Sequence, residues 1–310
     1  MQIHSDLSGL PGFERAVVTI GTFDGVHMGH QAILANLKAE AGKINGESVV
    51  ITFHPHPRKV LATARTPLLL NTLKEKTELL KGLGIDHLVV VPFNMEFAAL
   101  SAREYAEDFL LKKIKPHTLI IGYDHHFGHD REGNFNLLAE YAATGAFELV
   151  QIPEKVIEHI TISSTRIRNA LLAGNTILAA ELLGYDYFFS GTVVHGNQRG
   201  RTIGFPTANL DLGEPDKLVP GNGVYIVTAE LNGAEHQGMM NIGVRPTVEG
   251  NGRLTIEVHL LNFDADIYDE VLTVRLKARL RNERKFESFQ ELKEQLFSDR
   301  AAAEAYFNRQ

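Results

Sequence analysis

The chain of 310 residues is long enough to bury more than one hydrophobic core, and its 44% hydrophobic and 22% charged residues are ordinary proportions for a globular protein. The net charge of −7 argues against a nucleic-acid partner held by bulk electrostatics, and the absence of cysteine excludes disulfides, thiolate metal sites and a cysteine nucleophile. No segment is apolar over a membrane-spanning length and the N-terminus lacks a secretory pattern, so we expect a cytoplasmic protein without a membrane partner, either a monomer or a weak homo-oligomer.

The first predicted elements are a buried strand at residues 16–20 and a helix at residues 31–41, joined by the motif G-T-F-D-G-V-H-M-G-H at residues 21–30. A glycine-rich turn between a strand and a helix brings backbone N–H groups and the helix N-terminus close to any anion bound there. His27 and His30 are three residues apart, so both rings can point the same way. The motif predicts a site that binds phosphate and stabilises charge in a transition state.

Up to about residue 185, short apolar strands alternate with amphipathic helices. This order predicts a parallel sheet with helices on both faces and a ligand site at the carboxyl ends of its strands. We expect strands at residues 16–20, 48–53, 87–91, 118–122 and 147–152, and helices at residues 31–41, 73–83, 101–114 and 136–143.

After residue 185 strands follow one another without helices between them, which predicts an antiparallel barrel or sandwich. A final helix within residues 286–307 carries Phe286, Phe289, Leu292 and Leu296 on one face, a stripe more typical of core packing than of a ligand site. The change of pattern predicts two domains, 1–184 and 185–310. Strands are expected in the second at residues 188–194, 224–231, 237–242, 255–261 and 271–280.

Three further motifs of the first half fall at expected strand ends. The prolines of F-H-P-H-P-R-K-V-L at residues 53–61 require the strand to end near His54 and exclude a helix there. G-Y-D-H-H-F-G-H-D-R-E-G-N at residues 122–134 matches no zinc spacing and is interpreted as a mobile polar loop over the site rather than a metal centre. In I-S-S-T-R-I-R-N-A-L-L at residues 162–172, Ser163 or Ser164 can cap a helix whose N-terminus also binds phosphate.

In this order the motifs resemble the adenylyltransferase domain of bacterial bifunctional riboflavin kinase/FAD synthetases, and the first of them resembles the H-x-G-H signature of nucleotidyltransferases. The resemblance implies a Rossmann-like fold in which His27 and His30 stabilise charge while the phosphate of FMN attacks the α-phosphate of ATP. FMN is itself the nucleophile, so direct transfer without an adenylylated enzyme is expected.

The resemblance also implies roles for residues of the other motifs. Asp124 and Phe127 are expected to bind the flavin, although His125 and His126 depart from the family pattern between them. Arg168 is expected to act in catalysis as well as to hold phosphate. The remaining ATP and phosphate contacts implied in this half are Gly21, Phe23, Asp24, Gly25, Ser163, Ser164 and Thr165.

In the second half the run V-V-H-G-N-Q-R-G-R-T-I-G-F-P-T-A-N-L at residues 193–210 concentrates glycines, arginines and oxygen ligands. Its glycines allow a polyphosphate to approach the backbone, Arg201 supplies charge, and Pro206 stiffens the exit. Thr207 and Asn209 face one side of an extended segment and offer hard oxygen ligands suited to Mg²⁺. The alternative is a glycine-rich hairpin with incidental arginines. The glycines expected to bind phosphate are Gly196, Gly200 and Gly204.

This run, with matching motifs at residues 223–225, 241–247 and 257–264, resembles the riboflavin kinase family, whose fold is a small closed antiparallel barrel followed by a helix. Glu257 alternates with aliphatic residues on its strand, and the resemblance implies that it is the general base for the 5′-hydroxyl of riboflavin. Asn241 and Arg245 are weaker candidates for shaping the flavin site.

Together the two resemblances imply one chain that phosphorylates riboflavin to FMN in its C-terminal domain and adenylylates FMN to FAD, with release of pyrophosphate, in its N-terminal domain. ATP and Mg²⁺ serve both steps, and FMN is expected to leave one site and rebind at the other. Three alternatives remain: an N-terminal domain that acts weakly or on another phosphorylated acceptor, a flavin- or nucleotide-sensing module without turnover, and a generic cytidylyltransferase that leaves the second domain unexplained.

Overall fold

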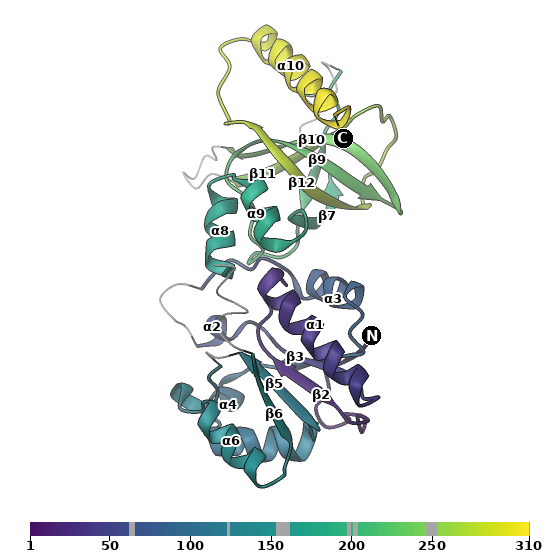
Figure 1. The fold of residues 1–310 in the computed structure, drawn as a ribbon. Helices are drawn as coiled ribbons and strands as arrows, with labels where there is room; N and C mark the ends of the chain where they lie inside the picture. The colour runs from purple at the N-terminus through teal and green to yellow at the C-terminus, as the bar shows by residue number, and fades with distance from the viewer. Residues whose placement is uncertain are drawn as a thin grey trace. The chain divides into compact units, whose positions relative to one another are not determined.

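The computed structural model describes residues 1–61, 66–122, 125–152, 162–196, 200, 204–245 and 253–309 (Figure 1). Contacts divide the chain into two compact units, Met1–Ser164 and Thr165–Gln310. The domain boundary predicted from the sequence, at residues 184/185, lies later in the chain than this division. The two differ because the two helices between residues 164 and 184 make their contacts mainly with the second unit. Among the described residues, every helix is too short or too polar to cross a bilayer.

The first unit is built on the expected parallel sheet. Its six strands lie in the order β1-β4-β3-β2-β5-β6, so the strand order reverses direction beside β2, where such sheets bind ligands. Helices cover both faces, and the central strands are therefore continuous buried runs rather than alternating ones. The strands are β1 Gln2–His4, β2 Val17–Ile20, β3 Ser48–His54, β4 His87–Pro92, β5 Thr118–Gly122 and β6 Glu148–Ile152.

Two helices on one face bury aliphatic side chains against the sheet: α1, Met28–Lys43, and α3, Leu73–Gly82 (Figure 1). The other face is covered by α6, Phe135–Ala143, and by a π-helix, η1, Tyr105–Ile114. The helix expected at residues 101–114 is therefore present, but most of it has π rather than α geometry. Three short helices are α2 Pro57–Val60, α4 Met95–Ala98 and α5 Ala102–Glu104, and η2 His129–Arg131 is a 3₁₀ turn.

The strand β3 ends at His54, as the prolines predict, but the expectation that they exclude a helix is wrong. Pro57 is the first residue of α2, a position where the missing N–H and the fixed φ of proline are tolerated. The edge strand β1 was not predicted, because three residues give no readable periodicity.

The second unit contains the expected closed antiparallel barrel, with strands in the order β10-β11-β8-β7-β12-β9. The strand β8 is an addition to the predicted set; its four residues were expected only to be extended. The strands are β7 Phe188–Val194, β8 Ala208–Asp211, β9 Gly223–Leu231, β10 Ala234–Arg245, β11 Arg253–Leu260 and β12 Val271–Arg281.

The helices α8, Ser164–Leu172, and α9, Thr176–Leu183, pack against this barrel. Arg279 of β12 donates to the carbonyl oxygen of Ala173 at 3.1 Å and to that of Asn222. A Cβ atom on Gly174 would lie 2.6 Å from the guanidinium of Arg279, so only glycine leaves room for this contact. Thr176 Oγ1 of α9 also donates to the Lys277 carbonyl of β12 at 3.4 Å, and the Gly221 N–H donates to the Leu171 carbonyl at 3.0 Å, so several contacts attach the helix pair to the barrel.

The C-terminal helix α10, Phe289–Phe307, packs Leu292 and Leu296 onto a cluster that includes Phe205 and Met239 of the barrel. The expected stripe is correct for these two leucines but wrong for Phe289, whose side chain is 59% exposed. Phe286 precedes the helix and stacks under the guanidinium groups of Arg281 and Arg284 instead.

Candidate active sites

The first candidate site is the turn between β2 and α1, at the carboxyl end of the sheet. Its backbone is unusual: Phe23, Gly25 and Val26 all have φ between +36° and +89°. For a β-branched residue such as Val26 this conformation is strained, and strain of this kind concentrates at functional sites. A Cβ atom on Gly21 would lie 3.2 Å from the ring of Phe23, so a larger residue there would require this ring to shift.

The two histidines of the turn stack on one another, with ring centroids 3.6 Å apart and an angle of 13° between the planes. His27 is the N-cap of α1, and its Nδ1 accepts from the backbone N–H of His30 at 3.3 Å. An accepting Nδ1 places the ring proton on Nε2, so that this nitrogen is a donor. The expectation that both rings point the same way is confirmed.

His30 carries the second ring of this pair. Its Nδ1 is shielded from solvent and has no hydrogen-bond partner in the described part of the chain. Burial lowers the pKa of His30 well below its ordinary value of 6.5, and the nearby His27 and Lys76 lower it further. The ring is therefore neutral at pH 7, and its shielded Nδ1 is a polar atom without a partner in the described residues.

Asp24 turns its carboxylate into the protein, where it is 3% exposed. Oδ1 accepts from the backbone N–H groups of Leu70 at 2.9 Å and Asn71 at 3.4 Å. The Asp24 carbonyl accepts from the Ser164 hydroxyl at 2.9 Å, which joins the first motif to the last motif of the unit. Of the other phosphate-binding candidates, Ser163 is exposed, and Thr165 and Arg168 lie on α8 in the second unit.

The loop after β5 is pinned to the start of the helical segment beyond β4. The backbones of Phe127 and Gly133 exchange two hydrogen bonds, and the N–H of His129 donates to the carbonyl of Leu100 at 2.7 Å. Gly128 has φ +74° and lies so close to Ala102 that a Cβ atom would be 2.7 Å from its backbone. These contacts join the described part of the loop to that helical segment, and the mobility expected of the loop stays a prediction.

Phe127 is buried and packs against Tyr105, with ring centroids 5.0 Å apart. The hydroxyl of Tyr105 is buried without a hydrogen-bond partner in the described part of the chain, and burial raises its pKa. Asp124 lies outside the described residues. Across the described residues, no three His, Asp or Glu side chains cluster closely enough to hold a metal ion.

One buried cation near the turn, Lys76, was not predicted from the sequence. Lys76 of α3 is 7% exposed, and its Nζ donates to the Thr22 carbonyl at 2.6 Å and to Thr52 Oγ1 at 3.3 Å. A lysine within an amphipathic helix is normally a solvated residue, so the pattern alone gave no reason to select it.

The second candidate site lies on the barrel. Glu257 of β11 is directly opposite Asn209 of β8 and Asn241 of β10. Opposed residues of antiparallel strands share a face, so the three side chains project together. The hydroxyl of Thr207 donates to Glu257 Oε2 at 3.5 Å. The structure thus brings together four of the residues selected from the sequence, and it confirms that Glu257 alternates with buried Ile256 and Val258.

The glycines of this run are constrained by the chain itself. A Cβ atom on Gly196 would lie 2.1 Å from Asn209 Nδ2, and one on Gly200 would lie 2.1 Å from the Phe205 carbonyl oxygen. Gly204 has φ +81°, a conformation that favours glycine. Arg201 and the side chain of Arg245 lie outside the part of the structure that is described.

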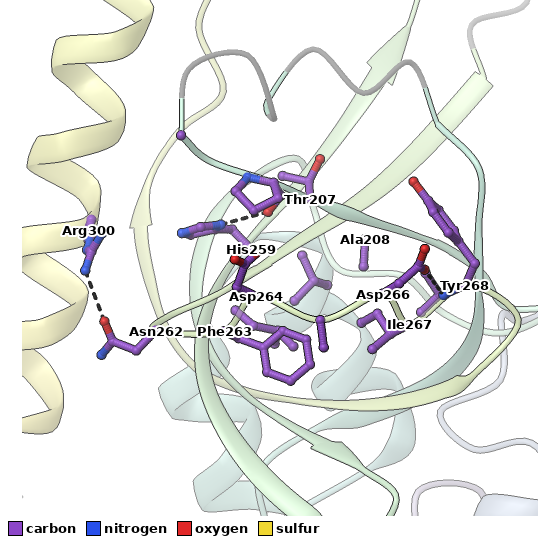
Figure 2. A pocket seen from close by; sticks show the side chains of 16 residues that line it. Thr207, Ala208, His259, Asn262, Phe263, Asp264, Asp266, Ile267, Tyr268 and Arg300 are labelled. Carbon is purple, nitrogen blue, oxygen red and sulfur yellow. Dashed lines mark hydrogen bonds between the residues drawn. The ribbon is translucent and has the colours of Figure 1, made fainter.

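A cavity of about 570 Å³ opens beside Thr207 (Figure 2). Its floor and walls come from β8, β11 and the loop that follows β11, with Pro206 at one side and Arg300 of α10 at another. Arg300 donates to Asn262 Oδ1 at 3.2 Å, which ties the loop to the helix. The sequence analysis selected Gly204, Pro206 and Thr207 of this lining and missed Arg300 and Tyr268.

His259 lines the same cavity. Its Nδ1–H donates to the Pro206 carbonyl at 2.8 Å, and the centroid of its ring lies 5.1 Å from the ring centroid of Phe205. Burial lowers the pKa of His259; the bond to Pro206 opposes this shift and the charge of Arg300 adds to it. His259 therefore fixes the Pro206 carbonyl just before β8 begins.

A Rossmann-like sheet with a histidine pair at its ligand-binding edge, followed by a six-stranded barrel, defines a two-domain protein that combines nucleotidyl transfer with a kinase-type site. A family model described as FAD synthetase matches residues 11–166, and one described as riboflavin kinase matches residues 183–307. Both families act with ATP and typically with a divalent metal.

The chain is similar along nearly its whole length to curated proteins named bifunctional riboflavin kinase/FMN adenylyltransferase. That of Pseudomonas fluorescens is 39% identical over 98% of this chain and 97% of its own length, and that of Escherichia coli K12 is 41% identical over 95% and 93%. A crystal structure from Streptococcus pneumoniae, described as a macrolide-efflux protein, covers 98% of each chain with a TM-score of 0.85 and 33% identity. The chain belongs to the bifunctional riboflavin kinase/FMN adenylyltransferase family.

Proposed function

We propose that this chain phosphorylates riboflavin to FMN in the barrel and converts FMN to FAD, with release of pyrophosphate, in the Rossmann-like domain. The observation that carries the proposal is that each domain matched to a family also holds a formed site. Thr207, Asn209, Glu257 and Asn241 meet on the barrel, and the stacked pair of His27 and His30 lies at the carboxyl edge of the sheet.

In the kinase step, Glu257 accepts the proton of the riboflavin 5′-hydroxyl as the oxygen attacks the γ-phosphate of ATP; the bond between the γ-phosphorus and the bridging oxygen breaks, and ADP leaves. The Thr207 hydroxyl already donates to this carboxylate, which orients it without neutralising it. Asn241, directly opposite Glu257, is proposed to contact the flavin, and Arg245, four residues further along β10, to shape the same site. The cavity beside Thr207 has a volume suited to a nucleotide base and its ribose.

The oxygen donors of the barrel fit Mg²⁺. Thr207 Oγ1 and the Asn209 amide oxygen are hard ligands, and the packing of Gly196 against the Asn209 amide holds that side chain in place. A bound Mg²⁺ neutralises the charge of the transferring phosphoryl group. Gly196, Gly200, Gly204, Arg201 and Pro206 are proposed to surround the phosphates of ATP.

In the adenylyl step the FMN phosphate attacks the α-phosphate of ATP directly. His27 donates through Nε2–H to the charge that develops there, and His30 lies parallel to it. The inward position of Asp24 indicates that it holds the turn, because a carboxylate repels phosphate. Gly21, Phe23, Gly25, Ser163, Ser164, Thr165 and Arg168 are proposed to contact the phosphates, and Phe127 and Asp124 the flavin.

The proposed division of labour assigns adenylyl transfer to residues 1–184 and phosphorylation to residues 185–310. FMN leaves the barrel and rebinds at the sheet. We propose that the protein acts in the cytoplasm on small molecules alone, without a nucleic-acid or membrane partner, as a monomer or weak homo-oligomer.

A chromatographic time course of the purified protein with riboflavin, ATP and Mg²⁺ tests the proposal. FMN is expected first and FAD afterwards, with pyrophosphate released in the second step. FMN without FAD would leave only the kinase assignment standing. No loss of riboflavin would overturn the function and favour a binding module.

A further inference from the structure

Lys76 is the one buried cation near the histidine turn that the proposed chemistry leaves without a role, within the residues that the structure describes. Its side chain is 7% exposed although the ammonium of lysine normally stays in water. Nζ donates to the Thr22 carbonyl at 2.6 Å and to Thr52 Oγ1 at 3.3 Å. Thr22 begins the turn after β2 and Thr52 lies on β3, so the ammonium sits beneath the turn, between two strand ends.

The carboxylates around Lys76 are already engaged. Asp24 accepts from two backbone N–H groups, and Glu75 closes the capping box of α3 with Thr72. In the described part of the chain no carboxylate forms an ion pair with Lys76, so its positive charge is not neutralised by direct contact. The remaining titratable groups that face it are His30 and, through the stack, His27.

Burial lowers the pKa of Lys76 from 10.5 to about 8, and the negative charge of Asp24 opposes this shift. The group is therefore protonated at neutral pH and loses its charge in mildly alkaline solution. A polyphosphate bound at the turn favours the charged form, and by linkage the charged form favours the polyphosphate.

We propose that Lys76 is a positioning residue of the adenylyl-transfer site, whose buried ammonium fixes the Thr22 carbonyl of the turn and supplies positive charge beneath the bound triphosphate. This inference rests on the proposed function of the N-terminal domain. It also gives Lys76 a second effect: its charge helps to keep His30 neutral, so that the ring meets its ligand as a hydrogen-bonding group.

The test compares FAD formation from FMN and ATP, between pH 6.5 and 9.5, by the full-length wild type and by Lys76→Met, Lys76→Arg and Thr52→Val. The wild type is expected to lose activity above about pH 8, mainly through a rising KM for ATP. Lys76→Met should raise that KM roughly tenfold at pH 7, a change of the size usual for electrostatic coupling, and should abolish the alkaline decline. Lys76→Arg should restore a low KM and move the decline upward, since arginine stays charged.

Thr52→Val keeps the lysine but removes one acceptor of its ammonium, so the alkaline decline should begin at a lower pH. Lys38→Met is the matched control, because Lys38 also donates to a backbone carbonyl, that of Leu83 at 2.7 Å, but from the exposed surface of α1. Riboflavin phosphorylation by the same chains is a second control and should not change.

If activity declines at the same alkaline pH in Lys76→Met and in the wild type, the inference is overturned. FAD formation by the wild type would still support the proposed function of the domain. The inference would also be overturned if Thr52→Val left the pH of the decline unchanged and Lys76→Arg had as high a KM for ATP as Lys76→Met. Lys76 would then have only a structural role. If the wild type forms no FAD from FMN, the proposed function of this domain fails, and the inference fails with it.

Discussion

At the scale of single residues, both candidate sites depend on side chains that the fold has already oriented. Glu257 is held by the Thr207 hydroxyl and flanked by two asparagines on neighbouring strands. The Nδ1 atom of His27 accepts from the first turn of its own helix, which fixes the ring and makes Nε2 the donor nitrogen. Orientation of this kind is what lets a weak base or a neutral donor act in a transition state.

Glu257→Gln is expected to lower riboflavin phosphorylation by about 100-fold or more, the usual contribution of a general base, while FAD formation from added FMN continues. Glu230→Gln is the control, because Glu230 is a barrel carboxylate that pairs with Arg275 at the surface. Separate assays of the two steps on each variant check the prediction. Equal loss in both variants would indicate general damage to the barrel.

His27 allows stability and activity to be separated. His27→Ala removes both the N-cap acceptor and the Nε2 donor, so it should lower the free energy of unfolding by about 1 kcal/mol and FAD formation by about 100-fold. His27→Asn restores a capping side chain, so it should recover the stability but not the activity. Urea unfolding and FAD assays on both variants test this; recovery of activity in His27→Asn would show that the ring acts only as a cap.

At the scale of elements, short connections place the chemistry. The turn after β2 contains three residues of positive φ before α1 begins, and Gly196, two residues after β7, lies so close to Asn209 that a Cβ atom would be 2.1 Å from its Nδ2. The π-helix η1 begins at Tyr105, whose buried hydroxyl faces the pinned loop of Phe127. Irregular geometry in these places is typical of functional sites.

Gly196→Ala tests the barrel turn. The added methyl group would lie 2.1 Å from Asn209 Nδ2, so the amide must move away from Glu257. We expect at least a tenfold loss of riboflavin phosphorylation and a higher Mg²⁺ requirement, with FAD formation from FMN unchanged. Gly42→Ala, where the new methyl group meets no atom within 4 Å, is the control. Titrations of kinase activity with Mg²⁺ measure both variants.

At the scale of the whole molecule, buried histidine and lysine side chains make the free energy of unfolding depend on pH. The folded-state pKa values of His4, His30, His259 and Lys76 all lie below their ordinary values. For each group, at pH values between its folded-state pKa and its ordinary pKa, the unfolded chain binds more protons than the folded chain. The free energy of unfolding therefore rises with pH over that interval. The three histidines make the protein lose stability as the pH falls below about 6.5.

Lys76 adds a window on the alkaline side. Burial of the charged Lys76 side chain lowers the free energy of unfolding at neutral pH. Its pKa is lowered from 10.5 to about 8, which corresponds to about 3 kcal/mol, and this cost disappears as the pH rises from 8 to 10.5. Lys76→Met should therefore be more stable than the wild type at pH 7, and the difference should shrink toward pH 10. Denaturant unfolding of both chains at several pH values checks this; a difference independent of pH would contradict it.

The sequence by itself determined the fold class and the main site residues. Apolar periodicity located every strand of five residues or more, because such strands repeat their pattern often enough to be recognised. The motifs indicated His27, His30, Thr207, Asn209 and Glu257, since side chains that must act together are often close in the chain or lie in motifs of fixed order.

Only the tertiary structure decided the rest. The short strands β1 and β8 form because neighbouring strands pair with them, and the π-helix gives no separate signal in the sequence. Phe289 is exposed although it shares the periodicity of Leu292. Lys76, Thr52 and Arg300 gain their positions from partners far away in the chain, such as Thr22 and Asn262. Burial and charge at these residues arise from packing between elements, and a periodic pattern describes only one element at a time.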